Sequence, residues 1–238
     1  MRGRINAYNL VVAISICALL MQCVYAAVPS CTPSTWLNVF VKEHLEFEAN
    51  PNNPTEYYYS WNPGTATGHG DGTDPTYAVD APATEGDTQV DVIITSQKAP
   101  ACAAQICYGL HVYKCCPTAQ TDYCTTDTPT FCWYGSCGTT APFTPDSSIK
   151  FEWYVNDETT PISIEGCYSP NFETDPGYIL PTKDEPVKTQ TVTLKVLQDT
   201  SGAKYPHEPA TIELYTCTLT FDLHWKPEGD IGVSKTFP

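Results

Sequence analysis

Cysteines crowd into one short segment of this 238-residue chain. Seven of the twelve lie between Cys102 and Cys137, separated by four, seven, zero, seven, seven and four residues. A thiolate metal site would need Cys-x2-Cys pairs or nearby histidines. The segment contains no such pair and a single histidine, His111. The spacing therefore favours a fold that is cross-linked by disulfides through this segment.

The N-terminus predicts that these disulfides form outside the cytosol. Two arginines precede an apolar run at 10–20, and residues 24–27 place small side chains at the −3 and −1 positions of a cleavage site. We predict a signal peptide at 1–26 and a secreted, extracellular chain from 27 to 238. The apolar run is shorter than the ~20 residues of a membrane span, so no membrane span is expected.

Ten cysteines remain after that cleavage, and an even number in an oxidising compartment allows up to five disulfides. Because the segment 102–137 holds seven of them, an odd number of bridges must connect it to the rest of the chain if all ten are paired. We therefore expect one secreted domain over 27–238. The cysteines expected to be bridged are Cys31, Cys102, Cys107, Cys115, Cys116, Cys124, Cys132, Cys137, Cys167 and Cys217.

Alternation of apolar and polar residues predicts an all-β fold. The clearest pattern is Ile149, Phe151, Trp153 and Val155 on one strand face. Threonine occurs 32 times and leucine 12 times, which excludes a helix bundle. We predict a disulfide-rich antiparallel β-sandwich of about seven or eight strands with long Pro- and Gly-rich loops. Extended structure is expected at 36–49, 89–96, 108–114, 149–156, 192–196 and 211–225, and the largest surface loop at 62–86.

One sequence order is similar to that of immunoglobulin-type domains. Cys137, Trp153 and Tyr215-x-Cys217 follow the order Cys, Trp, Tyr-x-Cys, with the tyrosine two residues before the second cysteine. An aromatic residue and a half-cystine that alternate along one strand give the same order. We therefore predict a sandwich and assign no family.

Motifs for catalysis are missing from the sequence. The segment 134–138 departs from the Gly-x-Ser-x-Gly spacing of hydrolases. We expect no enzyme, no catalytic residue, no cofactor and no metal ligand set. Asp71 and Asp74, on a glycine-rich stretch, fit either an ordinary turn or a Ca²⁺ site. The five histidines lack the spacing of a metal-binding helix: His44, His69, His111, His207 and His224.

Charge and aromatic residues carry the functional prediction. The net charge is −15, or −17 after cleavage because ten basic residues then face 27 acidic ones, so nucleic acid is a poor partner. A basic extracellular protein or peptide is the predicted partner. The alternative is a matrix or cell-wall component that binds carbohydrate or Ca²⁺, and the third is a secreted glycoside hydrolase-like enzyme with paired carboxylates. The candidate contact residues, which core packing would equally explain, are Tyr57, Tyr58, Tyr59, Trp61, Trp133 and Tyr134.

Overall fold

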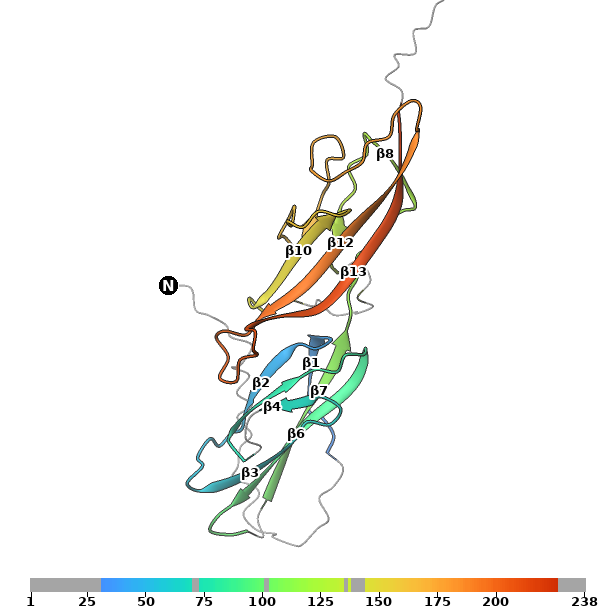
Figure 1. Cartoon of the computed structure of the whole chain (residues 1–238). Coiled ribbons are helices and arrows are strands. Elements are labelled where there is room, and N and C mark those ends of the chain that lie inside the picture. Colours follow the sequence, from blue (N-terminus) through green and yellow to red (C-terminus); the bar gives the residue numbers. More distant parts are fainter. Residues whose placement is uncertain (1–30, 70–72, 101–102, 135–136, 138–143, 227–238) are drawn as a thin grey trace, which may run out of the picture. The chain divides into compact units, whose positions relative to one another are not determined.

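The computed structural model describes residues 31–69, 73–100, 103–134, 137 and 144–226. Within these ranges the chain forms thirteen strands and no helix, so the prediction of a disulfide-rich, sandwich-like all-β fold is confirmed (Figure 1). The described residues accordingly contain no helix that could cross a bilayer. The predicted signal peptide lies outside the described residues.

The strands form four sheets. Their bounds are β1 Thr35–Phe40, β2 His44–Glu48, β3 Tyr57–Asn62, β4 Thr67–His69, β5 Thr76–Asp80, β6 Gly86–Ser96, β7 Ala103–Tyr113, β8 Asp122–Cys124, β9 Phe131–Cys132, β10 Ile149–Val155, β11 Cys167–Tyr168, β12 Val187–Asp199 and β13 Thr211–His224. The strand orders are β1-β7-β6-β3, β2-β5-β4, β10-β12-β13-β8 and β11-β9. The sequence predicts antiparallel pairing, but β1 pairs with β7 and β8 pairs with β13 in parallel.

The described chain forms two compact units, each assembled from three stretches of sequence. Strands β10, β12 and β13 each contribute residues to both units. The single cooperative domain expected over 27–238 stays a prediction. The first unit takes the described parts of 1–115, 137–150 and 196–215, and the second those of 116–136, 151–195 and 216–238.

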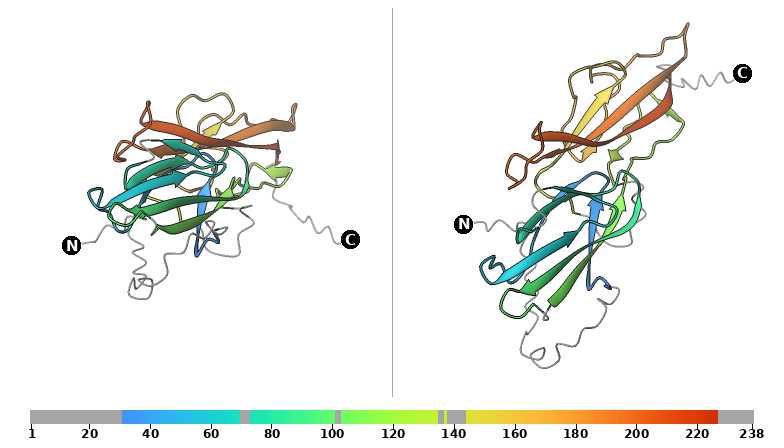
Figure 2. Two further views of the ribbon diagram at one scale, coloured as in Figure 1. Left: turned by 90° about the horizontal axis from the view of Figure 1, so that it is seen from below. Right: turned by 60° about the horizontal axis from the view of Figure 1, so that its bottom comes forward.

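The first unit contains two sheets whose facing side chains make an aromatic core. Phe47 on β2 lies 5.1 Å from Tyr108 on β7 between ring centroids, and Trp61 on β3 stacks on Tyr77 of β5 at 5.5 Å. These contacts join β1-β7-β6-β3 to β2-β5-β4 as two layers, whose strands Figure 2 shows from two further directions. Burial of such rings is the main source of stability for a core of this kind.

The second unit has a separate aromatic core. Trp153 of β10 is fully buried, and its indole Nε1 donates to the carbonyl oxygen of Glu165 at 2.7 Å. Phe131 on β9 and Phe221 on β13 lie 5.9 Å apart, and Tyr123 on β8 packs edge-on against Phe221 at 5.0 Å. The strand with the clearest alternation in the sequence therefore supplies the central indole of this core.

Four disulfides cross-link the described residues: Cys31–Cys107, Cys115–Cys137, Cys116–Cys217 and Cys132–Cys167. Three of them leave the segment 102–137, which agrees with the odd number expected. Cys124, half-buried in β8, makes no bridge to another described cysteine, because the others pair among themselves, and its predicted bridging stays a prediction. Cys102 lies outside the described residues. Cys137 and Cys217, which delimit the immunoglobulin-like order, bridge to other cysteines.

The prediction of a surface loop at 62–86 is wrong for two stretches, which form strands. Strands β4 and β5 lie within it, and both pair in antiparallel fashion, β5 with β2 and with β4. Glycine, aspartate and proline are frequent in this segment, and these residues are depleted in strands and favoured in turns. Cross-strand pairing and the buried run Tyr77, Ala78 and Val79 outweigh that local preference.

Candidate metal centre

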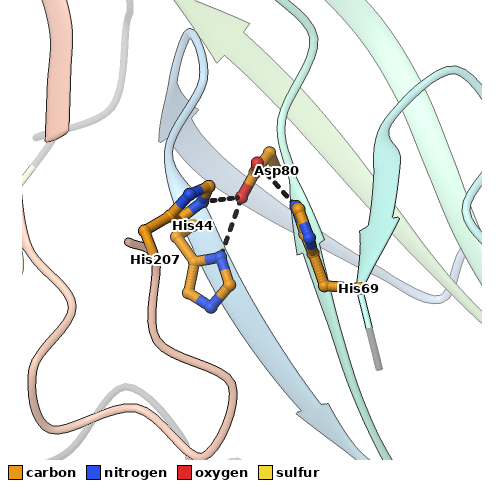
Figure 3. A group of neighbouring side chains, drawn as sticks. All are labelled: His44, His69, Asp80 and His207. Atoms are coloured by element: carbon orange, nitrogen blue, oxygen red, sulfur yellow. Dashed lines mark hydrogen bonds and ion pairs between the residues drawn. The ribbon is translucent and has the colours of Figure 1, made fainter. Parts of the chain in front are cut away.

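Four side chains of the first unit converge on one point. His44, His69, Asp80 and His207 each offer one ligand atom, and these four atoms all lie within 4.8 Å of one another (Figure 3). The Asp80 Oδ1 atom lies 2.8 Å from His44 Nδ1 and 2.8 Å from His207 Nε2, and Oδ2 lies 2.6 Å from His69 Nε2. Three imidazoles thus surround a single carboxylate.

Sheet register places three of these side chains. In the antiparallel pair of β2 and β5, His44 lies directly opposite Asp80. On the other side of β5, Asp80 lies opposite Thr67, and His69 is two residues further along β4. Because residues two apart point to the same face of a sheet, His69 reaches Asp80 diagonally.

A buried amide fixes the backbone of His44. Gln198 at the end of β12 accepts a hydrogen bond from His44 N at 2.7 Å and donates from Nε2 to His44 O at 2.9 Å. Glu43, one residue earlier, accepts a hydrogen bond from Phe40 N at 2.6 Å. These bonds close the turn between β1 and β2 and set the point at which β2 begins.

His207 comes from the loop between β12 and β13. Its backbone N donates to Thr200 Oγ1 at 3.0 Å, inside the loop. Tyr205 ties the loop to the sheet: its backbone N donates to Glu46 Oε1 at 2.9 Å, and its hydroxyl donates to Asp74 Oδ2 at 2.9 Å. The fourth ligand is therefore held by contacts on two sides.

The carboxylate of Asp80 is ionised over the whole physiological range. Burial by itself raises its pKa, but hydrogen bonds from His44, His207 and His69 outweigh burial and lower the pKa to about 2. An ionised carboxylate only accepts hydrogen bonds, so each ring nitrogen that faces it carries a proton. A metal ion bound by these residues would displace those protons, since metal binding by histidines releases protons.

One atom of the cluster is poorly satisfied. His44 Nε2 is buried and has no hydrogen-bond partner among the described residues. A buried polar atom without a partner costs about 1–3 kcal/mol, and native proteins carry few such atoms. The cluster therefore carries a cost in folding free energy, which favours a functional reason for it.

The donor set fits a divalent transition metal ion. Imidazole and carboxylate ligands suit Zn²⁺, Cu²⁺, Fe²⁺ and Ni²⁺, whereas Ca²⁺ and Mg²⁺ prefer oxygen alone. A tetrahedral zinc ion with bonds of about 2.0–2.1 Å needs donor atoms about 3.3 Å apart. To meet that requirement, donor separations of up to 4.8 Å must shorten by about 1.5 Å, and the Asp80–histidine contacts of 2.6–2.8 Å must lengthen by about 0.5 Å.

The six aromatic contact candidates fall into three classes of burial. Tyr59, Trp61 and Trp133 are buried, so they belong to the cores and cannot act as surface anchors. Tyr57 is half-buried, while Tyr58 and Tyr134 are exposed. Alternation along β3 explains the difference, because Tyr59 and Trp61 share the inner face and Tyr58 points to the other.

The other acidic and histidine candidates lie outside the cluster. Asp71 of the possible Ca²⁺ turn is outside the described residues, and the Asp74 carboxylate is used by Tyr205. His111 and His224 pair singly with Asp87 and Asp122. No sequence pattern predicts the four-residue cluster, because its members share no local spacing.

Comparisons with known proteins assign no family. No protein-family model matches the sequence, and no curated protein matches it. Among solved structures, the chain is similar to mouse cadherin-23 EC22–24 (10% identity, 84% of this chain and 65% of that chain, TM-score 0.27). It is also similar to murine CEACAM1b (10% identity, 67% of this chain and 87% of that chain, TM-score 0.26). A third similarity, to a nucleoside hydrolase-related hypothetical protein from Saccharophagus degradans (14%, TM-score 0.27), covers 33% of this chain and 22% of that protein. Similarities with TM-scores this low define neither a fold family nor a function.

Proposed function

We propose that the protein is a secreted, disulfide-stabilised β protein that binds one divalent transition metal ion through His44, His69, Asp80 and His207. The observation that carries this proposal is the convergence of four ligand atoms within 4.8 Å. The net charge of −15 supports it, because a negative protein raises the local concentration of cations. Four disulfides support secretion, because such bonds persist in oxidising compartments.

The test is a metal titration of the purified protein after treatment with EDTA and removal of the chelator. Competition with a chromophoric chelator should give one tightly bound Zn²⁺ per chain. His69→Ala and His207→Ala should each weaken Zn²⁺ binding at least tenfold, since each removes one of four ligands. Both side chains are partly exposed, so the variants should keep the far-ultraviolet circular dichroism spectrum of the wild type.

His111→Ala is the matched control. His111 Nδ1 lies 2.7 Å from Asp87 Oδ1, so this variant also removes a histidine that is bonded to a carboxylate, but outside the cluster. Zn²⁺ binding should be unchanged in it. Weak or absent Zn²⁺ binding by the wild type, or equal loss in His111→Ala and His69→Ala, would contradict the proposal.

A second proposed function is the binding of a basic extracellular protein or peptide. Its support is the acidic composition together with Tyr58 on β3, a residue that is 61% exposed. Exposed tyrosines are frequent anchors at protein interfaces. Association should slow as NaCl is raised, and Tyr58→Ala should speed dissociation. Binding that ignores NaCl would instead favour the carbohydrate-binding alternative. Both proposals concern binding rather than catalysis.

A further inference from the structure

We infer that a metal ion held by His44, His69, Asp80 and His207 takes a fifth ligand from the side of an adjacent cavity, and that this ligand is a small carboxylate. This inference rests on the proposed metal-binding function. It adds the chemical class of the ligand that the loaded centre takes.

A cavity of about 590 Å³ adjoins the cluster. Asp80 and His207 form part of its wall, so an ion bound between them lies at the cavity surface. Cavities of about 300–1,000 Å³ are the usual size of small-molecule sites. An ion held by Asp80 and His207 can therefore be reached from the cavity.

The four ligand side chains differ in how far they are exposed to solvent. The His44 side chain is 2% exposed, whereas those of Asp80, His207 and His69 are 17%, 23% and 32% exposed. Four protein ligands complete a tetrahedral zinc site, so a further ligand binds only if the ion expands to five-coordinate, which zinc can do, and only from a side that solvent reaches. The ion here is enclosed on the His44 side and accessible on the side of the other three ligands.

The charged groups in the wall of the cavity determine which ligand charge is favoured. Besides Asp80 it carries one lysine, Lys42, and one glutamate, Glu213, with threonine hydroxyls and a short apolar stretch around Pro82. Once a divalent ion is bound, the ion and Lys42 outweigh the two carboxylates, and the cavity becomes cationic. An anion is then favoured there, and hydroxyl groups can donate hydrogen bonds to it.

A carboxylate is the anion that this wall fits best. One carboxylate oxygen can coordinate the ion, while the second oxygen accepts a hydrogen bond from the wall. The organic part of the ligand can lie against the apolar stretch at Ala81, Pro82 and Ala83. The cavity therefore complements both ends of a small organic acid.

The test uses Co²⁺ as a spectroscopic probe in the purified, EDTA-treated protein. Binding of Co²⁺ alone tests the proposed function through its visible absorption bands. Addition of azide or acetate to the Co²⁺ form tests whether the ion takes a fifth ligand, and each should change these bands in a saturable way. Lys42→Ala should weaken acetate binding about two- to fivefold, the effect of an exposed charge pair, with Co²⁺ affinity unchanged.

Two further variants separate the cavity from the metal site. Ala83 is an exposed wall residue, so Ala83→Phe should fill the cavity and remove the acetate response while Co²⁺ still binds. Lys98→Ala removes an exposed lysine 3.8 Å from Glu56, away from the cavity wall, and should leave both measurements unchanged. Co²⁺ bands that stay constant in saturating azide and acetate would overturn the inference and leave metal binding standing. Failure to bind Co²⁺ would overturn both.

Discussion

Replacement of Glu43 by glutamine should stabilise the protein at pH 8 and leave its stability nearly unchanged at pH 4. Glu43 is buried in the turn between β1 and β2, where its Oε2 accepts a hydrogen bond from Phe40 N. Burial raises its pKa from 4.5 to about 7, against the opposing effect of the Phe40 hydrogen bond and with a contribution from the negative charge of Asp146. Glutamine keeps an oxygen for Phe40 N and cannot ionise.

The magnitude follows from the two pKa values. Between pH 4.5 and 7 the folded protein keeps a proton on Glu43 that the unfolded chain has lost, so wild-type stability falls as pH rises through this window. One pKa unit corresponds to 1.36 kcal/mol, and the gap therefore costs about 3 kcal/mol above pH 7. The glutamine variant avoids this cost, which corresponds to roughly 6–12 °C in melting temperature for a chain of this size.

The assay is thermal and guanidinium unfolding of both proteins at pH 4, 5.5, 7 and 8, with EDTA present so that metal binding does not contribute. The difference in unfolding free energy should grow across the window and then level off. Glu56→Gln, at an exposed carboxylate, is the control and should show no such growth. A difference that is independent of pH, or a less stable Glu43→Gln protein at pH 8, would refute the reasoning.

Three further predictions concern the core and the metal site. Trp61→Ala should lower the unfolding free energy by about 3–5 kcal/mol in denaturant titrations, because the ring is buried against Tyr77; a loss below about 1 kcal/mol would contradict a core role. Tyr205→Phe removes the hydroxyl that bonds Asp74 and holds the loop of His207. It should weaken Zn²⁺ binding about tenfold in competition titrations without changing the stoichiometry, and unchanged affinity would count against this positioning role. Zn²⁺ at a hundred times its Kd should raise the unfolding free energy by about 2.7 kcal/mol, reversibly with EDTA and not in His69→Ala.

The strands that the sequence predicts well are those with one buried face. The alternation at 149–156 and 211–225 matches β10 and β13 to within a residue or two. Side-chain period alone identifies such strands, since a shift by one residue would expose the whole apolar set. Short strands such as β4 lack enough residues to show a period, and they form only because a neighbouring strand pairs with them.

In the aromatic run at Tyr57–Trp61, alternation predicts which rings share a strand face but not which face is buried. Four rings in five positions require that some of them face away from the others, and the sequence leaves open whether that second face is buried. The structure buries Tyr59 and Trp61 and exposes Tyr58. The assignment depends on which side of β3 meets the β2-β5-β4 sheet, and that is decided by residues elsewhere in the chain.

The proposed metal centre depends entirely on residues that are far apart in the sequence. Asp80 is separated from its three histidine partners by 11, 36 and 127 residues, so no local motif connects them. Antiparallel register brings His44 opposite Asp80, and the loop after β12 supplies His207. A donor set of this kind exists only when the first unit is folded, and the unfolded chain presents four isolated weak ligands. If the site binds a metal ion as proposed, the binding free energy adds to the folding free energy of the first unit. Substitutions that loosen β2, β5 or the loop should then weaken metal binding even where they touch no ligand.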